Sequence, residues 1–114
     1  MSDRNLKRAI EPVNAEEVLR KLAGLPISTW SYRSDPASVR HLGPMAQDFK
    51  QAFGLGDTDR AYHAIDAQGV ALAAIQALGR LTEEQRQRIV NLERENQELE
   101  RRLKALENRG RGSR

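Results

Sequence analysis

The sequence contains no cysteine, so it can form neither a disulfide nor a thiolate metal site. Its two histidines are isolated from each other, and they do not indicate a metal centre. We therefore expect neither a metal nor a cofactor. No apolar run approaches the roughly 18 residues of a membrane-spanning helix, and no signal peptide is recognisable. The sequence predicts no membrane span and no Sec-type export.

An excess of charge of one sign is also missing from most of the chain. Residues 1–66 hold nine basic and nine acidic side chains, and residues 67–108 hold seven of each. The net charge of +3 comes from Arg109, Arg111 and Arg114. This distribution does not favour nucleic acid as a partner. We expect residues 109–114 to be a flexible basic tail.

A long stretch without proline, residues 67–107, dominates the C-terminal part. With Ile75 at heptad position a, apolar residues recur every 3.5 residues, and Thr82 and Gln85 interrupt them. No second helix of this length is available to cover such a seam, so it predicts a parallel coiled coil between identical chains. The expected interface residues are Ile75, Leu78, Ile89, Leu92, Asn96, Leu99, Leu103 and Leu106.

The number of chains in this coil is less strongly specified. Arg88 and Glu93 flank two apolar positions in an order that resembles a short pattern of three-stranded coils. In a parallel coil they also form an attractive pair between chains. Asn96 at an a position fixes the register, but in two-stranded coils it favours dimers. We favour a homotrimer over a dimer.

The first 66 residues predict a small head. An extended arm (1–13) precedes a helix that Asn14 caps and Gly24 ends. Residues 27–33 form the best strand, with Trp30 and Tyr32 on a core face. A second short helix, with Pro44 in its first turn, is closed by glycines. Residues 61–65 suggest another strand, and Asp66 is expected to cap the long helix. The predicted class is α+β, mainly α. A head (1–66) with short strands and two short helices precedes a long helix (67–108) in a parallel trimeric coiled coil.

Three stretches in order resemble the peptidase S74 family, the C-terminal intramolecular chaperone domain of phage tail spikes and fibres, endosialidases among them. They are SDRNLKRAI (2–10), HLGPMAQD (41–48) and AYHAID (61–66), the last running into the long helix. The resemblance extends from residue 2 to about residue 80. Only Met1 precedes Ser2, so we expect an excised or already released domain.

The resemblance implies a serine–lysine dyad that cuts the peptide bond just before the serine. Ser2 and Lys7 match the family's five-residue spacing. A serine hydroxyl needs a base, and a lysine with an ordinary pKa of about 10.4 can act as one only when its surroundings favour the neutral amine. Asp3, His41 and Gln47 are possible supporting residues. A hydrogen-bonded structural role is equally open for His41 and Gln47, and Asp3 could orient the dyad or cap a turn.

These implications predict an intramolecular chaperone that trimerises, assists the folding of the fibre segment ahead of it, and then releases itself. It would act in the host cytoplasm during assembly, and its parent protein would lie in a phage tail or on a bacterial surface. The alternative is a permanent trimerisation cap that is never cleaved. A zipper-type DNA-binding dimer is disfavoured, because such proteins need a basic helix ahead of the heptads and residues 67–79 contain no basic residue.

Overall fold

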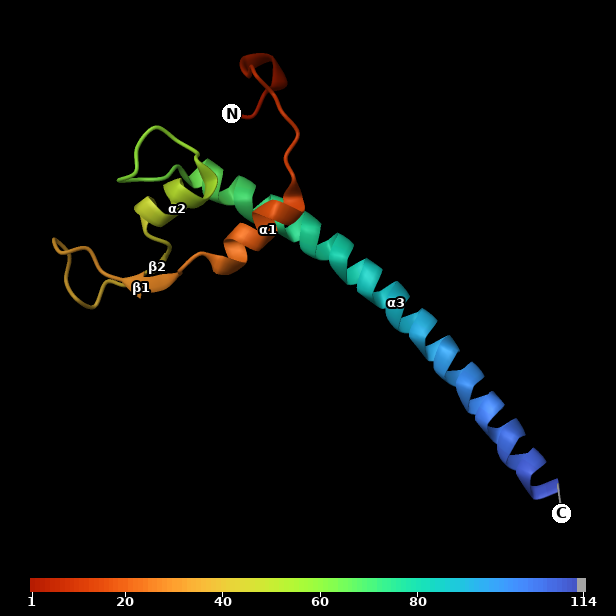
Figure 1. Cartoon of the computed structure of the whole chain (residues 1–114). Coiled ribbons are helices and arrows are strands. Elements are labelled where there is room, and N and C mark those ends of the chain that lie inside the picture. Colours follow the sequence, from red (N-terminus) through yellow and green to blue (C-terminus); the bar gives the residue numbers. More distant parts are fainter. Residues whose placement is uncertain (113–114) are drawn as a thin grey trace. The chain divides into compact units, whose positions relative to one another are not determined.

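A computed structural model describes residues 1–112 of the chain. The fold is mainly helical and contains a two-stranded antiparallel sheet, two short helices and a long C-terminal helix (Figure 1), which confirms the predicted class. Contacts within the chain divide it into a first unit, Met1–Leu78, and a second that begins at Gly79. No helix in the described part is long and apolar enough to cross a bilayer. The elements in order are the 3-10 turn η1 (Arg4–Leu6), α1 (Ala15–Gly24), β1 (Ser28–Trp30), β2 (His41–Gly43), α2 (Ala46–Phe53) and α3 (Ala64–Gly112).

Local sequence signals correctly predict where α1 begins and where α2 ends. The Asn14 side chain accepts a hydrogen bond from the Glu17 backbone N–H at 3.2 Å, which satisfies one of the free donors at the start of α1. Gly54 ends α2 in the left-handed conformation, with φ of 64°, and its N–H bonds to the Lys50 carbonyl. The predicted start of α2 is wrong, because Pro44 lies before the helix and Met45 occupies the N-cap position without a side-chain hydrogen bond.

Three other local predictions are wrong. Residues 41–43 form β2, which pairs with β1 in the register Trp30 opposite His41, whereas the prediction had these residues leading directly into the second helix. Residues 61–65 contain no strand, because α3 begins at Ala64. Asp66 lies in the first turn of α3 and does not precede it. The helix continues through Gly112, and residues 113 and 114 of the predicted tail lie outside the described residues.

The core of the first unit centres on Phe49, whose exposed fraction is 2%. Its ring stacks on Tyr62, with centroids 4.8 Å apart, and packs against Phe53 at 5.1 Å. The small or aliphatic residues Ala15, Val70, Ala74 and Ala77 complete this core.

The predicted core face of the strand is only partly correct. Trp30 is half-buried, but Tyr32 is 55% exposed. The strand ends at Trp30 and has one partner strand, so the two-stranded sheet leaves more than half of the Tyr32 side chain exposed. These rings pack mainly on each other and on His41.

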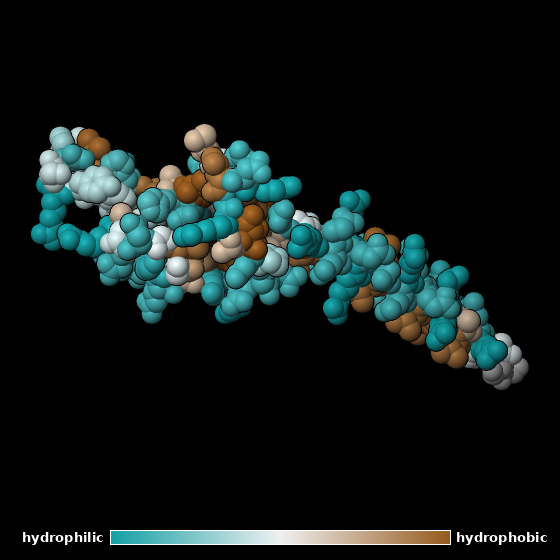
Figure 2. Space-filling model, turned by 90° about the horizontal axis from the view of Figure 1, so that it is seen from above, coloured by the Kyte–Doolittle hydropathy of each residue, from teal (hydrophilic) through white to brown (hydrophobic). Residues whose placement is uncertain are grey.

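The first turns of α3 carry two different apolar faces. Val70, Ala74 and Ala77 follow a helical spacing and are buried within the first unit. Ile75 and Leu78 lie on the neighbouring face, and both are more than half exposed. The head of the same chain therefore leaves the heptad face open. Farther along the helix the remaining apolar heptad residues are exposed as well, namely Ile89, Leu92, Leu99, Leu103 and Leu106. Figure 2 shows hydrophobic side chains, in brown, gathered along one side of this C-terminal part of α3.

Gly43 of β2 faces Tyr62, so the 41–48 and 61–66 stretches meet in the structure. A Cβ atom at position 43 would lie 3.0 Å from the Tyr62 hydroxyl oxygen, and the stacking on Phe49 restrains that ring. We expect Gly43→Ala to lower the free energy of unfolding by about 1–3 kcal/mol through overpacking. Chemical denaturation of the Gly43→Ala variant measures this loss.

The matched control adds Tyr62→Phe to Gly43→Ala. It removes the oxygen that the new methyl group would meet, so it should recover most of the lost stability. An unchanged denaturation midpoint for Gly43→Ala alone would contradict this packing argument.

Candidate active site

The structure brings Ser2 and Lys7 into direct contact on the N-terminal arm. The Lys7 Nζ donates a hydrogen bond to the Ser2 Oγ at 2.6 Å. This distance lies within the range over which a nucleophile and its base exchange a proton. The contact forms between residues of one chain, five positions apart.

A short turn positions this pair. The Leu6 N–H donates to the Asp3 carbonyl at 3.1 Å, and the Lys7 N–H donates to the Arg4 carbonyl at 3.2 Å. The turn between them reverses the chain enough for the lysine amine to reach the serine hydroxyl. Ala9, with φ of 53°, lies in the left-handed region that residues other than glycine rarely adopt, and it redirects the chain after the turn.

The pair is open to solvent in the single chain. Every residue from Met1 to Asn14 is exposed, and no ion pair within the described residues includes Lys7. A lysine becomes an effective base when burial without an acidic partner favours its neutral form. The arm therefore holds a serine hydroxyl and a lysine amine at the distance that the predicted dyad requires, and any burial of this pair must come from outside these residues.

The other two supporting candidates lie elsewhere. His41 packs against the rings of Trp30 and Tyr32, with centroids 5.0 and 5.3 Å away. Gln47 lines a depression of about 480 Å³ together with the same two aromatic residues. No hydrogen bond or ring contact found among the described residues joins His41 or Gln47 to Ser2 or Lys7. Of the three supporting candidates, Asp3 is the one that the described residues place in the turn between Ser2 and Lys7.

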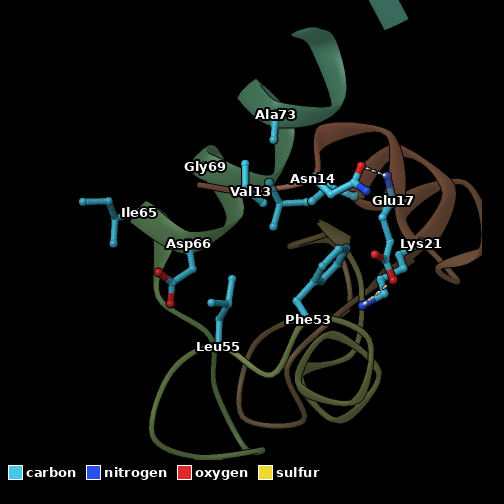
Figure 3. A pocket seen from close by; sticks show the side chains of 12 residues that line it. Val13, Asn14, Glu17, Lys21, Phe53, Leu55, Ile65, Asp66, Gly69 and Ala73 are labelled. Carbon is cyan, nitrogen blue, oxygen red and sulfur yellow. Dashed lines mark hydrogen bonds and ion pairs between the residues drawn. The ribbon is translucent and has the colours of Figure 1, made fainter. Parts of the chain in front are cut away.

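A second depression, of about 410 Å³, lies between α1, the end of α2 and the first turns of α3 (Figure 3). Val13, Phe53 and Leu55 give it apolar walls, and Ile65 and Asp66 of α3 stand at its side. None of the predicted site residues lines it.

The loop after α2 contains a polar contact that none of the sequence patterns above predicts. His63 lies directly before α3. Its Nε2 lies 3.2 Å from the Asp57 Oδ1, six residues earlier in the loop after α2. The Lys50 Nζ donates to the Gly56 carbonyl of the same loop at 2.6 Å. The partner comes from a loop, so a search at helix spacings could not find it.

The hydrogen bond from His63 holds the pKa of Asp57 below its usual value; a backbone hydrogen bond and the attraction of His63 and Lys50 add to this. A carboxyl group with a lowered folded-state pKa contributes stability that is present above its unfolded value, near 3.9, and is lost as pH falls through the folded value. Asp57→Asn should therefore lower the melting temperature at pH 6, and this difference should shrink as the pH falls below about 4.

Asp59→Asn removes a neighbouring carboxylate of the same loop and serves as the control. It should change the melting temperature little at either pH. An Asp57→Asn difference that is the same at pH 3 as at pH 6 would contradict a role for the ionised carboxylate.

Comparison with known proteins confirms the predicted resemblance. The family model Peptidase_S74, described as chaperone of endosialidase, matches residues 2–55. The matched range contains the arm with Ser2 and Lys7, both short helices and both strands. It ends before residues 61–66 and before α3. No curated protein matches the chain. The family description supports a chaperone role for a domain built of these elements.

Proposed function

We propose that this chain is a trimeric intramolecular chaperone of a phage tail spike or fibre, and that it releases itself by cutting the peptide bond before Ser2. The observation that carries the proposal is the 2.6 Å hydrogen bond between the Lys7 Nζ and the Ser2 Oγ. This contact between an amine and a hydroxyl supports the proposal, and both residues lie in the range that matches a family described as a chaperone.

The proposed reaction passes through an ester on Ser2. Lys7, once neutral, takes the proton of the Ser2 hydroxyl, and the Ser2 Oγ attacks the carbonyl carbon of the residue before it. The bond between that carbon and the Ser2 nitrogen breaks, the nitrogen takes up a proton, and the upstream segment is held as an ester on Oγ. Water then opens the ester, which frees the upstream carboxylate and restores the hydroxyl. Each chain performs this reaction once.

Assembly provides the cover that the single chain lacks. The exposed heptad face of α3 is separate from the face that the head buries, so α3 can pack with identical helices without disturbing its own head. In a parallel trimer the three heads are brought together at the same end of the coil. Their proximity, together with the upstream segment, would exclude water from the arms and favour the neutral lysine.

The direct test is expression of the chain behind a folded upstream segment, followed by denaturing gel electrophoresis. Two bands, whose masses add up to that of the fusion, support self-release. A single full-length band from a trimeric fusion would support the permanent cap and exclude self-release.

A further inference from the structure

Asp3 uses its carboxylate within the turn between Ser2 and Lys7. The Asp3 Oδ1 accepts a hydrogen bond from the Asn5 backbone N–H at 2.9 Å, while the Asp3 carbonyl accepts the Leu6 N–H. Asp3 is thus the N-terminal cap of η1, with backbone angles of −68° and 126°. No ion pair between Asp3 and Lys7 occurs in the described residues, although the two are close in sequence.

We infer that Asp3 is a positioning residue for the dyad: its side chain caps the η1 turn and thereby sets the approach of the Lys7 Nζ to the Ser2 Oγ. This inference rests on the proposed self-cleavage. An exposed arm has no packing to hold one conformation, so its few hydrogen bonds decide how often the productive turn is populated. Side-chain caps satisfy N–H groups that otherwise stay free at such a turn.

The capping role depends on an acceptor oxygen and not on a charge. Asparagine caps about as well as aspartate, while alanine does not cap. An Asp3 that acted by charge, by orienting or attracting the Lys7 ammonium, would need the carboxylate itself. Asp3→Asn therefore separates the two roles, because it keeps an acceptor at the same position and removes the charge.

The experiment measures single-turnover cleavage of a purified fusion carrying a stable segment ahead of Ser2. Cleavage should slow about fivefold to tenfold in Asp3→Ala, as expected when a cap worth a typical amount is lost. Asp3→Asn should cleave within about twofold of the parent. Glu11→Ala removes an exposed charge of the same arm outside the turn, and it should cleave like the parent.

The dependence of the rate on pH gives a second readout. The midpoint of the rate–pH profile should be the same for the parent, Asp3→Asn and Asp3→Ala, because the capping carboxylate does not act on Lys7. A shifted midpoint in Asp3→Asn, or a rate as low as that of Asp3→Ala, would overturn the capping role in favour of a charge role.

The remaining outcomes are equally decisive. A parent fusion that stays whole refutes the proposed function. A cleaving parent with an equally fast Asp3→Ala variant refutes only the role of Asp3. Loss of folding in Asp3→Ala would also overturn the inference, because Asp3 is exposed and contacts only the turn.

Discussion

A fusion that carries a folded segment ahead of Ser2 should stay whole when Ser2 is replaced by alanine. The substitution removes the Ser2 Oγ, the proposed nucleophile, which accepts a hydrogen bond from the Lys7 Nζ. Without this nucleophile the peptide bond should break at least about a thousandfold more slowly. Gel densitometry of purified fusions over time measures the effect. Ser38→Ala, at an exposed serine of the head, is the matched control and should cleave like the parent.

Substitutions of Lys7 test the base in the same assay. Lys7→Ala removes the amine, and Lys7→Arg replaces it with a guanidinium that keeps its proton at every usable pH, so both should block cleavage. An Lys7→Arg fusion that cleaves at the parent's rate would show that position 7 supplies only a positive charge.

Mixed assemblies show whether the dyad works within one chain. Because Ser2 and Lys7 already meet in the single chain, a Ser2→Ala fusion assembled with an Lys7→Ala fusion should not recover cleavage. If cleavage recovered in about a third of the chains of mixed trimers, serine and lysine would have to come from neighbouring chains. That result would contradict the pairing of Ser2 and Lys7 within one chain.

We expect the second large effect when a charge is introduced on the heptad face of α3, because it should prevent assembly of the proposed trimer. Leu92→Asp places a carboxylate on the heptad face, where the proposed trimer would bury three of them in one layer. We expect the parent to sediment as a trimer in analytical ultracentrifugation at micromolar concentration, and the variant as smaller species. Cleavage of the fusion should fall as well, because the arms then lack the cover of neighbouring heads.

The neighbouring position provides the control for this variant. Asn91→Asp introduces the same carboxylate one residue earlier and off the heptad face, so it should leave both the trimer and the cleavage rate unchanged. A parent that sediments as a monomer would contradict the coiled-coil assembly itself.

Signals that are local in sequence account for the parts of the fold that could be predicted. The Asn14 cap and the Gly54 end of α2 depend on hydrogen bonds and dihedral angles within a few residues, and both occur as expected. The contact between Ser2 and Lys7 is also local in sequence, because the single turn η1 lies between the two residues. The family resemblance drew attention to it, since an isolated serine and lysine near an N-terminus are common.

The missed features depend on partners that are distant in sequence or come from a loop. The pairing of β2 with β1 joins residues 28–30 to 41–43 across a ten-residue loop, and three-residue strands carry no clear alternation. Tyr32 looked like a core residue because aromatic residues usually are buried, but the small sheet leaves its side uncovered. The salt bridge of His63 with Asp57 depends on the path of a loop, which residue spacing does not reveal.

The mass of the fragment released from a fusion tests the central claim most directly. Intact-mass spectrometry of the small band should give one species that begins with Ser2 and carries an unmodified N-terminal amine. The upstream fragment should end with a free carboxylate at the preceding residue. A fusion that assembles as a trimer and shows no such fragment, or a fragment that begins at any residue other than Ser2, would contradict self-cleavage by Ser2 and Lys7.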